Sequence, residues 1–179
     1  MSLENPIIAV IGAGAVGGYY GARLAQHGFC VHLLSRGDGR AIAQSGMRIQ
    51  SRDGDFSLSP GQIHAHENSA SMPAADLILI TLKTTANDQF DKLITPILKK
   101  DSVILTLQNG LGNEQRLAEL FGAERVLGGM AFVCINRIGP GEILHTDHGL
   151  IQLGEFAGNS TQRAETIAAI FRKSGGKVI

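Results

Sequence analysis

Three closely spaced glycines near the N-terminus have the spacing of a loop that binds phosphate groups. The segment consists of Gly12, Ala13, Gly14, Ala15, Val16 and Gly17. In such loops the first glycine permits a sharp turn, the second lets the backbone approach a pyrophosphate, and the third lets the next helix pack closely on the sheet. The unpaired N–H groups at the start of that helix then favour an anion without a basic side chain. The spacing therefore predicts a nucleotide-binding loop.

The same spacing also arises by chance in glycine-rich turns that bind nothing, and this chain has 23 glycines. The surrounding pattern favours binding. An apolar, β-branched run at 6–11 precedes the loop, good helix formers fill 19–26, and a second apolar run follows at 30–34. Residues 7–34 therefore predict one strand–helix–strand unit of the length that dinucleotide-binding domains require.

Ser35 and Arg36 follow the second strand, where the choice between NAD and NADP is made. NAD-binding domains usually carry Asp or Glu there, about 20 residues beyond the loop, to bind the ribose 2′-hydroxyl. A guanidinium can instead bind a 2′-phosphate in a bidentate fork, and a serine hydroxyl can add a further contact. We therefore expect NADP(H), the alternative being that Arg36 is an ordinary solvated loop arginine.

Two polar residues, Lys83 and Asn109, follow two further predicted strands. Lys83 follows the apolar run 76–82, and Asn109 begins the turn 109–112 after the run 102–107. Open α/β sheets bind ligands at the carboxyl ends of their strands, so a cation there could attract a carboxylate or a cofactor oxygen. A solvated lysine and an ordinary Asn-Gly turn remain the alternatives.

The elements that position these residues alternate between strands and helices, which predicts a Rossmann-type, doubly wound α/β fold with a mostly parallel sheet. Further strands are expected at 47–51, 56–58, 126–135, 142–145 and 150–153, and helices at 40–44, 87–98, 114–121 and 164–173. The last three strands predict an antiparallel meander at the sheet edge. The polar stretch 64–75 is expected to be irregular, and 175–179 to be a linker or a strand.

Charge and hydropathy exclude some classes of partner. Sixteen basic and sixteen acidic residues cancel, so no overall field draws the chain to nucleic acid or to an anionic membrane. Its apolar runs are far shorter than the roughly 20 residues that span a bilayer. We expect a cytoplasmic protein, with any anion site confined to a local group of residues.

Cysteine and histidine spacing does not predict a metal site. Cys30 and Cys134 stand alone in apolar runs, so buried, reduced thiols are expected. His145 and His148 lie three apart without a third ligand nearby, and are expected to be histidines satisfied by the protein. The alternating histidines of 64–66 are expected to be surface residues. We therefore assign no metal ligands.

Five segments in order resemble the ketopantoate reductase (2-dehydropantoate 2-reductase) family. They are the glycine loop, Ser35-Arg36, Leu82-Lys83-Thr84, Asn109-Gly110-Leu111-Gly112 and His145-Thr146-Asp147-His148-Gly149. The resemblance covers nearly the whole chain, and other hydroxyacid dehydrogenases fit it less well. It implies NADPH-dependent reduction of a 2-oxo acid, the small-molecule substrate, in the pathway to pantothenate and coenzyme A. It also implies that Lys83 lies beside the cofactor, that Asn109 contacts cofactor and substrate, and that Cys134 lies near the cofactor.

The resemblance further implies a domain plan. Residues 1–174 correspond to the NADP-binding domain, and 175–179 to the start of a linker to a helical second domain that supplies a general-acid lysine. Lys173 and Lys177 precede that position and are not expected to take the role. We expect this chain alone to be nearly inactive. A homodimer is the expected assembly. The alternative is a stand-alone NADP(H)-binding sensor or regulatory module.

Overall fold

The computed structural model describes residues 5–158 and 161–179, so positions 1–4 of the predicted domain lie outside the described residues. The strands are β1 (Ile7–Ile11), β2 (Cys30–Leu34), β3 (Met47–Ser51), β4 (Phe56–Leu58), β5 (His64–His66), β6 (Ala75–Ile80), β7 (Leu98–Thr106), β8 (Val126–Gly139), β9 (Glu142–Glu155) and β10 (Lys177–Val178). The helices are α1 (Ala15–Gln26), α2 (Gly39–Ser45), α3 (Phe90–Ile94), α4 (Asn113–Phe121) and α5 (Gln162–Lys173), with 3-10 helices η1 (Ser69–Ser71), η2 (Thr84–Gln89), η3 (Thr95–Ile97) and η4 (Ala123–Arg125).

Four parallel strands, in the order β7-β6-β1-β2, form the centre of the sheet. Their continuous apolar sequences are typical of strands that are covered on both faces. The register places Ile11 beside Leu34 and Ile80, and Ile80 beside Thr106, so all four strands end at the same level. Because chain order reverses between β1 and β6, this edge is where an open α/β sheet binds ligands.

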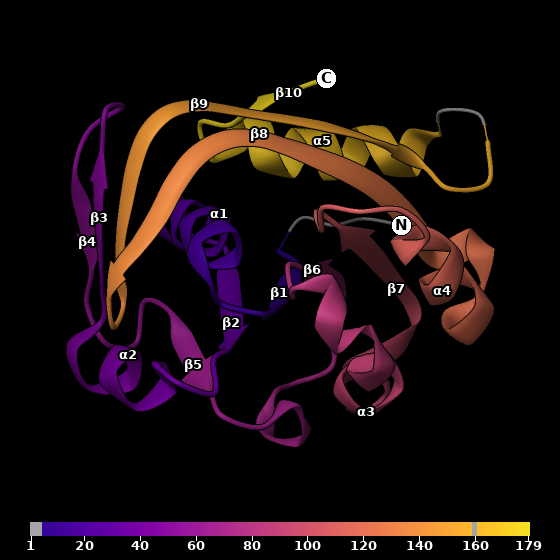
Figure 1. Ribbon diagram of the computed structural model, residues 1–179, viewed down its shortest axis with the longest axis horizontal. Coiled ribbons are helices and arrows are strands. Elements are labelled where there is room, and N and C mark those ends of the chain that lie inside the picture. Colours follow the sequence, from indigo (N-terminus) through magenta and orange to yellow (C-terminus); the bar gives the residue numbers. More distant parts are fainter. Residues whose placement is uncertain (1–4, 159–160) are drawn as a thin grey trace.

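Helices cover both faces of the central strands, which confirms the predicted Rossmann-type fold (Figure 1). α1 and α5 bury their apolar side chains in one core, and α3 and α4 bury theirs in a second core on the opposite face. The β8–β9 hairpin and the β3–β4 pair curve around α1, where Gly18 lies close to Ile143 and Met47. The domain is therefore a three-layer sandwich extended by a curved sheet.

The predicted antiparallel extension from the C-terminal part of the chain is confirmed, but its form as a meander at the sheet edge was wrong. β8 and β9 form one long antiparallel hairpin, and β9 also pairs in parallel with β3, so the hairpin lies inside the sheet. The strands expected at 142–145 and 150–153 are parts of one strand, β9, and residues 147–149 between them form a bulge. There His148 has φ 64° and Gly149 has φ 123°, and the register with β8 shifts nearby. A glycine-containing kink gives the same sequence signal as a turn.

Two further predictions were wrong in detail. Residues 64–66, expected to be irregular, form β5, a parallel edge strand beside β2. The sequence of β5 lacks the apolar run that predicts a buried strand, because an edge strand that is partly open to water can carry polar side chains. The helix expected at 87–98 is broken into η2, α3 and η3, with Pro96 in the last of these, and β7 already begins at Leu98.

The expectation of buried thiols was also wrong, because Cys30 and Cys134 are both exposed. An apolar run does not reveal which of its alternating side chains face the core. Residues 177–178, expected to be linker or strand, pair with β9 as β10. Within the described residues, no helix is long and apolar enough to cross a membrane.

Candidate functional site

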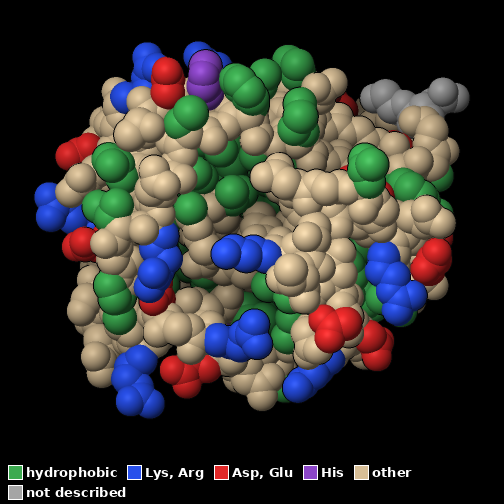
Figure 2. Space-filling model, in the orientation of Figure 1, with side chains coloured by type: hydrophobic (Ala, Val, Ile, Leu, Met, Phe, Trp, Pro, Cys, Tyr) green, Lys and Arg blue, Asp and Glu red, His purple; other side chains and the backbone are tan. Residues whose placement is uncertain are grey.

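A cavity of about 400 Å³ opens at the carboxyl ends of β1, β2 and β6. Its walls include the glycine loop, the turn after β2 and the segment after β6, which together contribute Gly12, Ala13, Gly14, Ser35, Arg36, Asp38, Thr81, Leu82 and Lys83, and β8 adds Arg137. Figure 2 shows Lys and Arg side chains bordering the hollow in this face of the molecule. Segments far apart in the sequence thus meet in one concave, largely cationic site.

The three glycines have different physical roles. Gly12 has φ 104°, and its carbonyl accepts a 2.7 Å hydrogen bond from Thr81 Oγ1, which fixes the loop against the segment after β6. A Cβ at Gly17 would lie 2.3 Å from Thr81 Oγ1, so this glycine permits close packing of α1. A Cβ at Gly14 would have no neighbour within 4 Å among the described residues. Gly14 is therefore the glycine that leaves space for a ligand.

The first turn of α1 is suited to an anion. Within 5–158 and 161–179, no side chain caps this helix at Gly14, and its first turn contains no carboxylate. Its leading N–H groups and its dipole are therefore available to a phosphate at the cavity. These features of the structure fit the predicted dinucleotide.

Arg36 is exposed at the cavity and forms no ion pair with any described residue, whereas Ser35 is buried beside it. Arg137, from the end of β8, reaches the same wall and holds Asp38 through two hydrogen bonds of 2.5 Å. The charge of Arg137 is balanced by this carboxylate, whereas Arg36 has no ion-pair partner among the described residues. Arg137 was not predicted from the sequence, because it lies 99 residues from its partner Asp38.

The hydrogen bonds from Arg137 hold the pKa of Asp38 below its usual value, against the opposing effect of burial. The ion pair therefore stabilises the fold fully above the unfolded-state pKa of about 3.9, and the stabilisation is lost as pH falls through the lower folded-state pKa. We expect Arg137→Met to cost about 1 kcal/mol near neutral pH, since the pair is partly exposed. Urea unfolding across pH should show this difference shrinking in acid, and a difference independent of pH would contradict the assignment.

A second cavity of about 360 Å³ adjoins the first and shares Thr81, Leu82, Lys83 and Thr85 with it. It is also lined by Val16 of α1 and by Leu107, Gln108 and Asn109 after β7. Lys83 and Asn109 are both exposed here, and neither side chain bonds to another described residue. The two cavities thus form one continuous groove. Lys83 lies where they meet, and Asn109 lies in the wall of the second cavity.

A buried amide network holds the two loops of this second cavity together. Gln108 donates to the Leu82 carbonyl and to Asn87 Oδ1, each at 2.9 Å. Asn87 donates to Asn113 Oδ1 at 2.7 Å, and Asn113 donates to the Gly110 carbonyl at 3.2 Å. The network fixes the Lys83 loop relative to the Asn109 turn. No sequence motif predicted this role for Gln108 and Asn113, because it depends on contacts between loops that are distant in the chain.

Asn113→Ala should lower the free energy of unfolding by about 1–3 kcal/mol, because it leaves buried polar partners without a hydrogen bond. Asn113 is 1% exposed, whereas Gln115 on the same helix is exposed and serves as the matched control. Chemical denaturation of Asn113→Ala and Gln115→Ala would measure the difference. Equal stabilities would mean that the network does not hold the loops.

Three of the residues predicted to bind the cofactor line neither cavity. Ala15 begins α1, Gly17 packs α1 against Thr81, and Cys134 lies exposed on β8. A cofactor contact for any of the three stays a prediction. His145 is buried, and its ring nitrogens face Tyr19, Ser51 and the carbonyls of 147 and 148. It is a histidine satisfied by the protein, as expected.

A glycine loop at a topological switch point, with a groove that runs past four strand ends, defines a Rossmann-type domain of the dinucleotide-binding class. The model of the family described as ketopantoate reductase PanE/ApbA matches residues 8–158. The chain therefore belongs to the ketopantoate reductase family.

Individual relatives agree with this assignment. The 2-dehydropantoate 2-reductase of a Nostoc species is 43% identical over 172 residues, covering 93% of this chain and 53% of the relative. The crystal structure of the 2-dehydropantoate 2-reductase from Geobacter metallireducens is 48% identical with a TM-score of 0.92, covering 96% of this chain and 56% of that one. The chain thus spans about half the length of the relatives it matches. D-mandelate dehydrogenase, solved with NADH and anilino(oxo)acetate, shares the fold at 23% identity and a TM-score of 0.85.

Proposed function

We propose that this chain is the NADP(H)-binding part of an NADPH-dependent 2-oxo acid reductase, with 2-dehydropantoate as the substrate. The observation that carries the proposal is that one cavity contains both Gly14, with open space beside it, and Arg36, which has no ion pair with a described residue. This cavity continues to Lys83 and Asn109. The family and its 2-dehydropantoate 2-reductases support the substrate. D-mandelate dehydrogenase, which shares the fold, was solved with NADH, so the preference of this chain for NADPH over NADH is tested by direct measurement.

Different residues of the groove bind different parts of the cofactor and the substrate. Bound NADPH supplies the hydride. Arg36 and Ser35 bind the 2′-phosphate, and the N-terminus of α1 binds the pyrophosphate beside Gly14. Lys83 attracts the carboxylate of the 2-oxo acid or a cofactor oxygen, and the Asn109 amide orients the groups that react.

Reduction of the carbonyl also requires a proton donor and support for the developing alkoxide. We propose that the donor is a lysine outside residues 1–179, in the helical domain that the family resemblance implies. The predicted domain plan, 1–174 followed by a linker, rests on the same resemblance. The cytoplasmic location and the homodimer stay predictions.

The 179-residue chain should therefore bind NADPH but oxidise it only very slowly in the presence of 2-dehydropantoate. Fluorescence titration would measure NADPH binding, and loss of NADPH absorbance would measure turnover, with a full-length family reductase as the positive control. Turnover at the rate of the full-length enzyme would overturn the placement of the proton donor. A sensor module would also bind NADPH saturably and show negligible turnover. The two functions are separated by joining this chain to the helical domain of a family reductase. Turnover that stays slow in the joined protein would favour the sensor module.

A further inference from the structure

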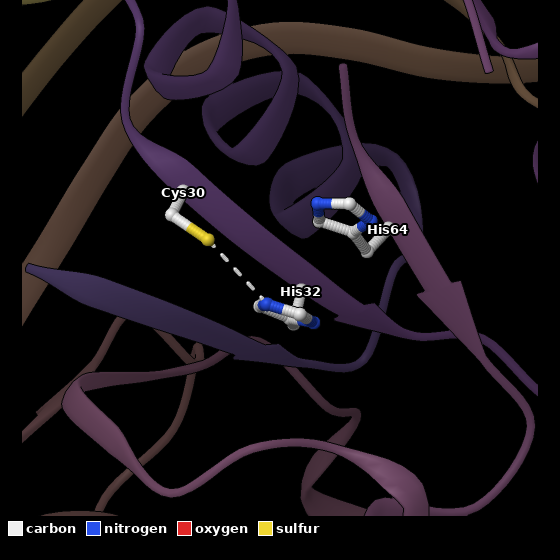
Figure 3. A group of neighbouring side chains, drawn as sticks. All are labelled: Cys30, His32 and His64. Carbon is white, nitrogen blue, oxygen red and sulfur yellow. Dashed lines mark hydrogen bonds between the residues drawn. The ribbon is translucent and has the colours of Figure 1, made fainter. Parts of the chain in front are cut away.

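One cysteine and three histidines gather on the outer face of the β2–β5 edge, away from the nucleotide groove. Cys30 and His32 alternate along β2, while Val31 and Leu33 point to the core on the opposite face. β5 places His64 directly beside His32 in the parallel register. Figure 3 shows the side chains of Cys30, His32 and His64 grouped on one side of the two strands. None of these three residues lines either cavity of the groove within the described chain.

The distances within this group match those of ligands around one ion. The candidate ligand atoms of Cys30, His32 and His64 all lie within 4.8 Å of one another. Cys30 Sγ lies 3.5 Å from His32 Nε2. Two ligands with Zn–S of about 2.3 Å and Zn–N of about 2.0–2.1 Å at a tetrahedral angle would be about 3.6 Å apart. The His64 ring stacks on the His32 ring with the centroids 4.7 Å apart, and because His64 is exposed its side chain can reorient to become the third ligand.

A chain of hydrogen bonds behind the group fixes the tautomer of His32. Ser71 donates its hydroxyl to the Asn68 carbonyl at 2.7 Å, so its oxygen accepts from His66 Nδ1 at 3.1 Å. His66 Nε2 is then an acceptor, and His32 Nδ1 must donate to it across 2.9 Å. The lone pair of His32 therefore lies on Nε2, the atom that faces Cys30. Metal-binding histidines are commonly oriented in this way by a partner on the other ring nitrogen.

We propose that Cys30, His32 and His64 form a zinc-binding site at the β2–β5 edge, oriented by His66 and Ser71. One thiolate with two imidazoles suits Zn²⁺, and three protein ligands leave the fourth tetrahedral position to water. Binding displaces the proton of the Cys30 thiol and joins the edge strand β5 to β2. The same edge supports the nucleotide wall, because the Ser35 N–H donates to the His66 carbonyl at 2.8 Å.

Cobalt is the probe for this site, because a thiolate ligand gives tetrahedral Co²⁺ a charge-transfer absorption that histidines alone do not. The chain, prepared without an affinity tag and stripped with chelator, should bind one Co²⁺ with this band, and Zn²⁺ should abolish the band by displacement. Zinc should also raise the melting temperature in a concentration-dependent way. Cys30→Ser should lose the band, His64→Ala should weaken it, and Ser71→Ala should lower the affinity about 10-fold.

Cys134→Ser and His27→Ala are the matched controls, since each removes an exposed residue of the same type outside the group. Both should keep the wild-type affinity and band. NADPH binding by each variant reports that the fold is intact. The proposal is overturned if the wild-type chain shows no saturable cobalt band, or if the band survives Cys30→Ser or disappears with Cys134→Ser.

Discussion

Arg36→Ala should weaken NADPH binding by roughly 10- to 150-fold and leave NADH binding nearly unchanged. This range corresponds to the loss of a charge-assisted hydrogen bond worth about 1.5–3 kcal/mol. Arg36 is free of ion pairs among the described residues, so its removal leaves no buried partner unsatisfied and should not disturb the fold. Calorimetric titration of both proteins with NADPH and NADH would measure the effect.

Arg40→Ala is the matched control, because Arg40 is an exposed arginine four residues away, on α2, and does not line the cavity. It should bind both nucleotides as the wild type does. The assignment of Arg36 to the 2′-phosphate is wrong if wild type does not prefer NADPH, or if Arg36→Ala keeps the wild-type preference.

Substitutions of two glycines in the same loop should have opposite effects: Gly17→Ala should lower stability, and Gly14→Ala should lower the affinity for NADPH. Gly17→Ala would place a Cβ 2.3 Å from Thr81 Oγ1 and 2.4 Å from the Gly12 carbonyl. Overpacking of this kind costs about 1–3 kcal/mol or more. Gly14→Ala meets no described atom within 4 Å and should cost less than about 1 kcal/mol as a helix cap. Its methyl group instead enters the space of the pyrophosphate, so NADPH binding should weaken about 10-fold, or about 1.4 kcal/mol.

Thermal or urea unfolding without nucleotide, followed by NADPH titration of the folded proteins, would separate the two effects. Gly17→Ala should lose stability first, and Gly14→Ala should lose affinity with its stability nearly intact. The reverse pattern would show that Gly17, rather than Gly14, is the glycine that the ligand approaches.

The central part of the site was predictable from the sequence because parallel strands bring their carboxyl ends to one edge. The apolar runs before Gly12, Ser35, Lys83 and Asn109 were enough to predict that these residues would lie together. The register confirms that the four strands end at one level, and the cavities contain the four residues. Local sequence is thus sufficient to predict a site residue wherever the fold class alone determines where that residue lies.

The remaining parts depend on contacts that local sequence does not encode. Arg137 reaches Asp38 only because the β8–β9 hairpin curves around α1, and a curvature of this kind has no signature in a strand pattern. The Gln108 network depends on the packing of the two loops that follow β6 and β7. The Cys30 group required β5, whose polar sequence resembled a loop and concealed the alignment of its histidines with β2.

The most direct test of the account is a crystal structure of this chain with NADP⁺. It should show the 2′-phosphate bound by Ser35 and Arg36, the pyrophosphate at Gly14 and the N-terminus of α1, and the nicotinamide in the cavity lined by Lys83 and Asn109. A nucleotide bound outside this groove, or one whose 2′-phosphate lies away from Arg36, would contradict the account.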